Sequence, residues 1–177
     1  MRYAAIAVAA LAIGAGAFFG LQGGASDQIT EQDTASRQQQ YEVLVAGSGM
    51  QVDMVGAEEM DQAIETMPVS QEQKTELREQ VQTGQVRLAW LTLWDTHAED
   101  GDILRFESDA AVPVEVMALN APTTLAIPFP ASGTVKVTGV VDGGGGITIA
   151  LKSGSAQIAW PTMRPGDTLD LPVTPGL

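Results

Sequence analysis

The chain has 177 residues, with 9 Lys and Arg, 22 Asp and Glu, one His and no Cys, and its formal net charge is −13. This length allows one domain of ordinary size and an appendage. The acidity argues against nucleic-acid binding, because such a surface repels phosphates. The lack of cysteine excludes disulfides, thiolate nucleophiles and Cys-ligated zinc or iron–sulfur clusters.

An uncharged apolar run, Tyr3–Leu21, lies at the start of the chain. As a helix it would span roughly 28 Å, close to the hydrocarbon thickness of a bilayer. Arg2 precedes the run and acidic residues follow it, so the positive-inside rule places Met1 in the cytoplasm. We therefore expect residues 1–22 to form an anchor in the inner (cytoplasmic) membrane, with the C-terminal domain periplasmic or extracellular.

The alternative for this segment is a cleaved signal peptide, since Gly23, Gly24 and Ala25 offer small residues at cleavage positions. The apolar run is longer than the ~7–15 residues of a typical signal peptide, which favours the anchor.

Small residues recur along the predicted anchor at Ala12, Gly16 and Gly20. Such a stripe lets a second membrane helix approach closely. We expect this face to pack against other transmembrane subunits, and the alternative is a face that simply contacts lipid.

Residues 23–85 are predicted to be an acidic linker with a helical hairpin. The polar stretch 22–40 is either a linker or a solvated helix. Residues 41–56 fit either a strand turned by glycine or a helix broken by it. Many of the acidic side chains lie in this part of the chain, as a solvated surface or as an acidic face for a basic partner.

Helical periodicity predicts helices over 57–67 and 70–83. Pro68 ends the first helix. Ser70 and Gln73 have the spacing of a capping box at the start of the second.

Residues 86–177 are predicted to form an antiparallel β-sandwich of about eight strands, so the fold class is mainly β. Val135 and Val137, for example, alternate with polar residues, as on a strand with one buried face. The first run is apolar on both faces and should be central. The glycines after Asp142 predict a hairpin loop. The extended runs are 86–95, 103–108, 112–118, 123–128, 134–141, 147–152, 156–160 and 168–173.

The loop after the first of these runs gathers acidic side chains, and calcium binds 6–8 oxygen ligands of this kind. Asp142 could add a ligand if its loop lies at the same end of the sandwich. The spacing is not that of an EF-hand, and the alternative is a plain polar turn. The predicted metal ligands are Asp95, Glu99, Asp100, Asp102 and Asp142.

The stretch Trp94-Asp95, followed after four residues by Asp100-Gly101-Asp102, resembles the W-D-x-x-x-x-D-G-D segment of bacterial extracytoplasmic β-sandwich modules. Some of those modules are C2-like and bind calcium. The resemblance covers about 15 residues. It implies a sandwich more strongly than it implies a metal.

Other candidate residues have simpler interpretations. His97, the only histidine, is expected to be an exposed loop residue, with a supplementary metal ligand or a pH-sensitive contact as alternatives. Ser48 lacks the outer glycines of a G-x-S-x-G nucleophile elbow. The methionines Met50, Met54, Met60 and Met67 are expected to pack in helices rather than bind copper. Trp90, Trp94 and Trp160 are expected in the core, with an exposed platform for sugar or a partner as the alternative.

These observations lead us to expect a non-catalytic, single-pass accessory or structural subunit of a larger bacterial membrane complex, whose β body contacts other proteins. By analogy alone, energy-transducing, photosynthetic and respiratory assemblies contain such subunits. The alternative is an extracytoplasmic calcium- or carbohydrate-binding module. No enzyme activity and no cofactor other than calcium are expected.

Overall fold

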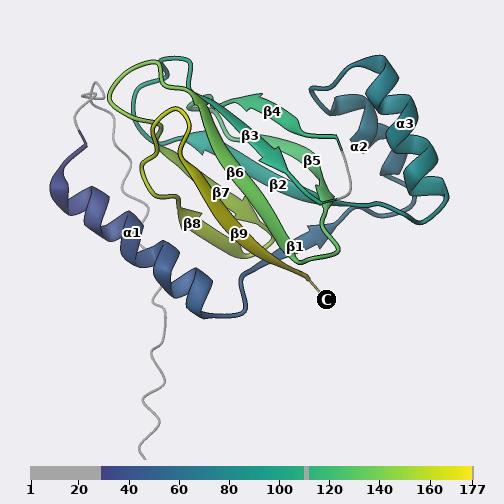
Figure 1. Cartoon of the computed structure of the whole chain (residues 1–177), viewed down its shortest axis with the longest axis horizontal. Coiled ribbons are helices and arrows are strands. Elements are labelled where there is room, and N and C mark those ends of the chain that lie inside the picture. The colour runs from purple at the N-terminus through teal and green to yellow at the C-terminus, as the bar shows by residue number, and fades with distance from the viewer. Residues whose placement is uncertain (1–28, 110–111, 177) are drawn as a thin grey trace, which may run out of the picture.

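The computed structural model describes residues 29–109 and 112–176 (Figure 1). The predicted anchor, with Ala12, Gly16 and Gly20, lies outside these ranges. Within them, no helix is both long enough and apolar enough to cross a membrane. The described chain is mainly β, with nine strands and three helices.

All eight strands predicted in the C-terminal body are confirmed, and a ninth, β1 (Met50–Met54), comes from the segment that fitted strand or helix. β1 lies within the sheet, so the sheet takes in residues well before position 86. The other strands are β2 (Arg87–Asp95), β3 (Ile103–Glu107), β4 (Val114–Met117), β5 (Thr123–Phe129), β6 (Thr134–Val141), β7 (Ile149–Ser153), β8 (Ala156–Ala159) and β9 (Thr168–Pro175).

The strands follow the order β4-β3-β6-β9-β1-β2-β7-β8, with β5 on the second edge of β2. The eight predicted strands pair antiparallel with one another, as predicted. The sheet as a whole is mixed, because β1, which precedes the predicted body, pairs in parallel with β9. These two strands lie more than a hundred residues apart in the sequence. No turn therefore ties the direction of one to that of the other.

The predicted central position of the first run is confirmed. β5 pairs along most of one edge of β2, while β1 and then β7 share the other edge. Ala89, Leu91 and Leu93 alternate along β2 and are fully buried. Figure 1 shows β6 and β9 crossing in front of β2 and β7, which fits the predicted sandwich.

The connection from β6 to β7 is not a hairpin, so that prediction is wrong. β6 pairs with β3 and β9, whereas β7 pairs with β2 and β8. A glycine run signals a tight turn but does not say which strands pair. Position 143 needs a glycine for a reason other than a hairpin turn: a Cβ there would lie 2.0 Å from the carbonyl oxygen of Asp100.

The predicted helical hairpin is confirmed as α2 (Met60–Thr66) and α3 (Gln71–Gln82), which Figure 1 places at one end of the molecule. Both hydrogen bonds of the Ser70–Gln73 capping box form. The chain before β1 is a third helix, α1 (Glu31–Ala46), which lies along β8 and β9.

Candidate functional site

One face of α1 fastens the helix to the β body through Arg37. This side chain is only 6% exposed. Its Nη1 donates to the carbonyl oxygens of Ile149 and Trp160, both at 3.0 Å, and its Nη2 donates to Thr96 Oγ1 at 2.5 Å. Burial lowers the pKa of Arg37, while the charges of Asp33 and Asp95 act to raise it.

Two further residues of the same face reach the body at helical spacing. The hydroxyl of Tyr41 donates to the carbonyl oxygen of Asp170 at 2.9 Å, and its ring meets Trp160 edge-on, with 5.1 Å between centroids. Gln40 Oε1 accepts from the backbone N–H of Ala159. The helix is therefore docked, and the polar stretch is not a free linker over this part.

Three of the predicted metal ligands meet at one end of the β core. Asp95, Asp100 and Asp102 each place a carboxylate oxygen within 4.8 Å of the other two. Asp95 is the last residue of β2 and faces inward in the same alternation as Leu91 and Leu93. Asp102 precedes β3 and shares the inward parity of Leu104.

Backbone and hydroxyl donors hold two members of this carboxylate cluster. Asp95 Oδ1 accepts from the N–H of His97 and from the hydroxyl of Thr148. Asp102 Oδ1 accepts from the N–H of Gly143, and its Oδ2 accepts from the N–H of Thr148. The cluster therefore joins the β2–β3 connection to the β6–β7 connection.

The carboxylate cluster is electrostatically costly as it stands. Asp95 and Asp102 are 3% and 1% exposed. Two ionised carboxylates this close repel by roughly 4 kcal/mol at an effective dielectric constant of about 20. Burial raises the pKa of Asp95, and burial raises the pKa of Asp102 to about 6, with the charges of Asp100 and Asp95 adding to it.

The side chains of the other two predicted ligands lie outside the cluster and accept hydrogen bonds from backbone N–H groups. Glu99 Oε2 accepts from the N–H of Asn120. Asp142 Oδ1 accepts from the N–H groups of Gly144 and Gly146 within its own loop. That loop does lie at the same end of the sheet as the carboxylate cluster, because Gly143 packs on Asp100.

A short path of contacts connects the carboxylate cluster with α1. Thr148, which donates twice to the cluster, accepts through its carbonyl oxygen from the N–H and the hydroxyl of Thr96. Thr96 Oγ1 also accepts from Arg37. His97 is half-buried beside this path, with Nδ1 3.2 Å from Thr96 Oγ1, so it is less exposed than predicted.

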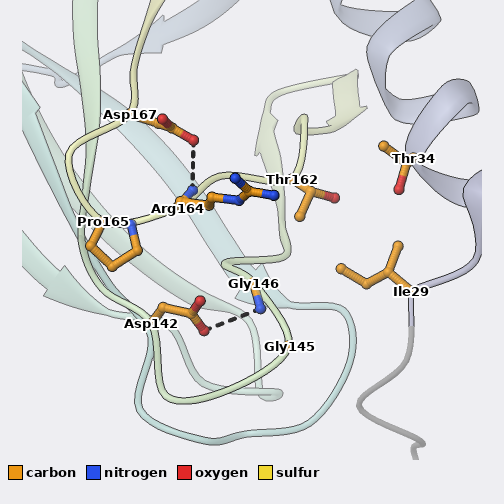
Figure 2. Close-up of a pocket in the computed structure, with 9 residues that line it drawn as sticks. All are labelled: Ile29, Thr34, Asp142, Gly145, Gly146, Thr162, Arg164, Pro165 and Asp167. Carbon is orange, nitrogen blue, oxygen red and sulfur yellow. Dashed lines mark hydrogen bonds between the residues drawn. The ribbon is translucent and has the colours of Figure 1, made fainter.

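A pocket of about 740 Å³ lies next to this region, between α1 and the loops that follow β6 and β8 (Figure 2). Arg164 extends across it toward Thr162 and Thr34 in Figure 2. Asp142 and Gly146 form its floor in that view. The pocket is not the carboxylate cluster, although Gly146 also lines the narrow crevice beside Asp100.

The tryptophans and methionines lie in or against the core, but the prediction that the methionines pack in helices is wrong for Met50 and Met54, which lie on β1. Trp160 is fully buried and Trp90 packs against the core. Trp90 and Trp94 are half-buried on β2, so none of the three tryptophans is fully exposed, as the alternative of a carbohydrate platform would need. The four methionines Met50, Met54, Met60 and Met67 are buried or packed on the core. Ser48 is exposed in the turn after α1.

An apolar row lies on the outer surface of β4, β3 and β6. Ile103 is opposite Met117 on one side and Val141 on the other. Met117 is 50% exposed and Val141 is 41% exposed. A register shift between Ile103 and Leu104 turns Val141 outward. Sequence reasoning missed this row, because it depends on which strands pair.

Comparison with family models, curated proteins and solved structures gives no match for this chain. The resemblance of the Trp94–Asp102 stretch to C2-like modules stays a prediction.

Proposed function

We propose that this chain is a non-catalytic accessory subunit of a larger bacterial membrane complex. In this proposal residues 1–22 anchor it, and the β body lies outside the cytoplasm and contacts other subunits. The observation that carries the proposal is the docking of α1 on the body through Arg37.

Docking of α1 limits how far the body can lie from the membrane. Only residues 23–30 separate the predicted anchor from α1. Fully extended, a segment of this length spans at most roughly 28 Å. A body fastened to α1 would therefore stay near the bilayer surface, as expected for a subunit that packs beside other membrane proteins.

Two surfaces of the body support contact with a partner. The outer apolar row of Ile103, Met117 and Val141 offers hydrophobic side chains that a monomer gains nothing by exposing. The α2–α3 hairpin presents exposed carboxylates such as Glu72 and Glu76, which suit a basic partner surface.

The test is gentle detergent extraction of the chain from its native membrane, followed by native gel electrophoresis and mass spectrometry. We expect the chain to migrate with other membrane proteins at fixed stoichiometry. Migration alone in several mild detergents would overturn the proposal.

A surface variant sharpens this experiment. Met117→Lys places a charge in the apolar row, and we expect the chain to stay in the membrane but leave the complex. Val43→Lys is the matched control, because Val43 is 63% exposed on α1, outside the row. The control variant should comigrate as the wild type does.

A further inference from the structure

We propose that Asp95, Asp100 and Asp102 bind one hard divalent cation of the calcium class, which fastens the β2–β3 connection to the β6–β7 connection. This inference goes beyond the accessory role and is independent of it, because a cation could bind whether or not the chain joins a complex.

The spacing of the oxygens fits a single calcium ion. The three carboxylates bring one oxygen each within 4.8 Å of the others. Calcium binds oxygen at 2.3–2.6 Å, so two ligands on opposite sides of the ion are about 4.6–5.2 Å apart. Three oxygens within 4.8 Å of one another lie at most about 2.8 Å from a common centre, so a small shift of the side chains lets all three contact one ion. The remaining ligands would be carbonyl oxygens of the two connections, or water that enters with the ion.

A second observation, at the oxygen atoms themselves, also points to a cation. Asp95 is 3% exposed, and its Oδ2 has no hydrogen-bond partner. Asp100 Oδ1, in the same cluster, is also buried without a partner. A buried carboxylate oxygen without a partner is costly. A cation between the carboxylates would give both unpartnered oxygens a ligand contact and would neutralise the repulsion between the negative charges.

The surrounding donors hold the ligands in place rather than compete for them. Thr148 and Gly143 donate to the two oxygens of Asp102, and each carboxylate oxygen has a further lone pair for an ion. Hydrogen bonds of this kind orient the ligands of many metal sites.

A narrow crevice lined by His97, Asp100, Gly144 and Thr148 borders the carboxylate cluster at Asp100. The crevice has no room for a water molecule. An ion that enters by this crevice has to displace part of its lining, and the glycine loop between Asp142 and Ile147 allows such a movement. We expect slow binding and slow release of the ion.

Isothermal titration calorimetry and thermal melting of the full-length protein test the site. The protein is first treated with EDTA and then titrated with CaCl₂ at pH 7.5, with MgCl₂ in a parallel titration. We expect one calcium ion per chain and a rise in Tm that grows with the calcium concentration.

Asp100→Asn is the most informative variant. Among the described residues, none donates a hydrogen bond to the Asp100 side chain, so the substitution should leave the fold intact. We expect calcium binding at least tenfold weaker. Glu99→Gln is the matched control, since this neighbouring carboxylate lies outside the cluster and only caps Asn120. It should bind calcium as the wild type does.

Three results would overturn the proposal. The first is no heat and no Tm shift with millimolar calcium. The second is equal loss of binding in both variants, which would indicate a general charge effect. The third is a calcium-independent rise in the Tm of Asp100→Asn with no binding by the wild type, which would indicate that a shared proton relieves the cluster.

Discussion

Asp102 is a carboxyl group that the fold buries at the end of an apolar strand face. Its pKa is about 6 in the folded protein, against an ordinary value of 3.8 for an aspartic acid. The folded state therefore binds a proton more tightly than the unfolded state. The stability that this difference contributes is fully present below about pH 4 and is lost as the pH rises to about 6. A shift of this size corresponds to about 3 kcal/mol.

We expect the free energy of unfolding of the wild type, measured by urea denaturation in EDTA, to fall between pH 4 and pH 7. The fall should exceed that of Asp102→Asn by up to about 3 kcal/mol. The comparison removes the opposing effects of Asp33 and Asp109, whose pKa values are lowered by hydrogen bonds. Asp61→Asn, at an exposed helix position, is the control and should follow the wild type. Parallel curves for wild type and Asp102→Asn would contradict the prediction.

The inward position of the cluster could have been predicted from the alternation along the strands. Asp95 continues the parity of the apolar residues Leu91 and Leu93, and Asp102 continues that of Leu104. The separate roles of Glu99 and Asp142 could not be predicted in this way. They depend on which backbone N–H groups the fold brings near, and local sequence does not fix that.

At the scale of the element, the docking of α1 depends on one buried guanidinium. Arg37→Met keeps much of the aliphatic packing but removes three hydrogen bonds to the body. Hydrogen bonds to a charged group contribute about 1.5–3 kcal/mol each in favourable cases, although the sum for one side chain is smaller. We expect α1 to separate from β8, which hydrogen exchange of the α1 amides would detect.

Gln39→Met is the control for this experiment, because Gln39 is exposed on the same helix. Its α1 amides should keep the protection of the wild type. Unchanged protection in Arg37→Met would show that Tyr41 and the packing of Leu44 suffice to dock the helix.

The docking of α1 was missed because its contact face is not a continuous apolar stripe: Arg37 and Gln40 lie on it beside Tyr41 and Leu44. Apolar periodicity finds helices that bury leucine and valine, and it finds α2 and α3 in this way. The polar part of this face, Arg37 and Gln40, bonds to backbone groups of β7, β8 and Trp160 and to the hydroxyl of Thr96. Only the tertiary fold supplies those partners.

At the scale of the molecule, local patterns found eight strands but not their partners. Alternation and turn residues act over a few positions, which is why runs such as 134–141 coincide with a strand of the structure. The pairing of β1 with β9 joins distant parts of the chain. A β body that begins at residue 86 therefore lacks a strand from the middle of its sheet.

This position of β1 leads to a prediction about fragments of the chain. Removal of β1 takes Met50 and Val52, both 1% exposed, out of the core and leaves β9 and β2 without the strand between them. Each such side chain contributes about 1.5–3 kcal/mol when buried, and the free energy of unfolding of a whole domain is only about 5–15 kcal/mol.

We expect fragment 29–177 to melt cooperatively and fragment 86–177 to show no cooperative transition by circular dichroism. Fragment 47–177 keeps β1 and the α2–α3 hairpin and loses α1, so it separates the loss of α1 from the loss of β1 and the hairpin, whose Ile64 and Leu77 are also buried in the core. It should melt cooperatively at a lower Tm than 29–177. If fragment 86–177 melted at the same temperature as 29–177, the prediction would be wrong. The strands after residue 86 would then form a stable core without β1 between β9 and β2.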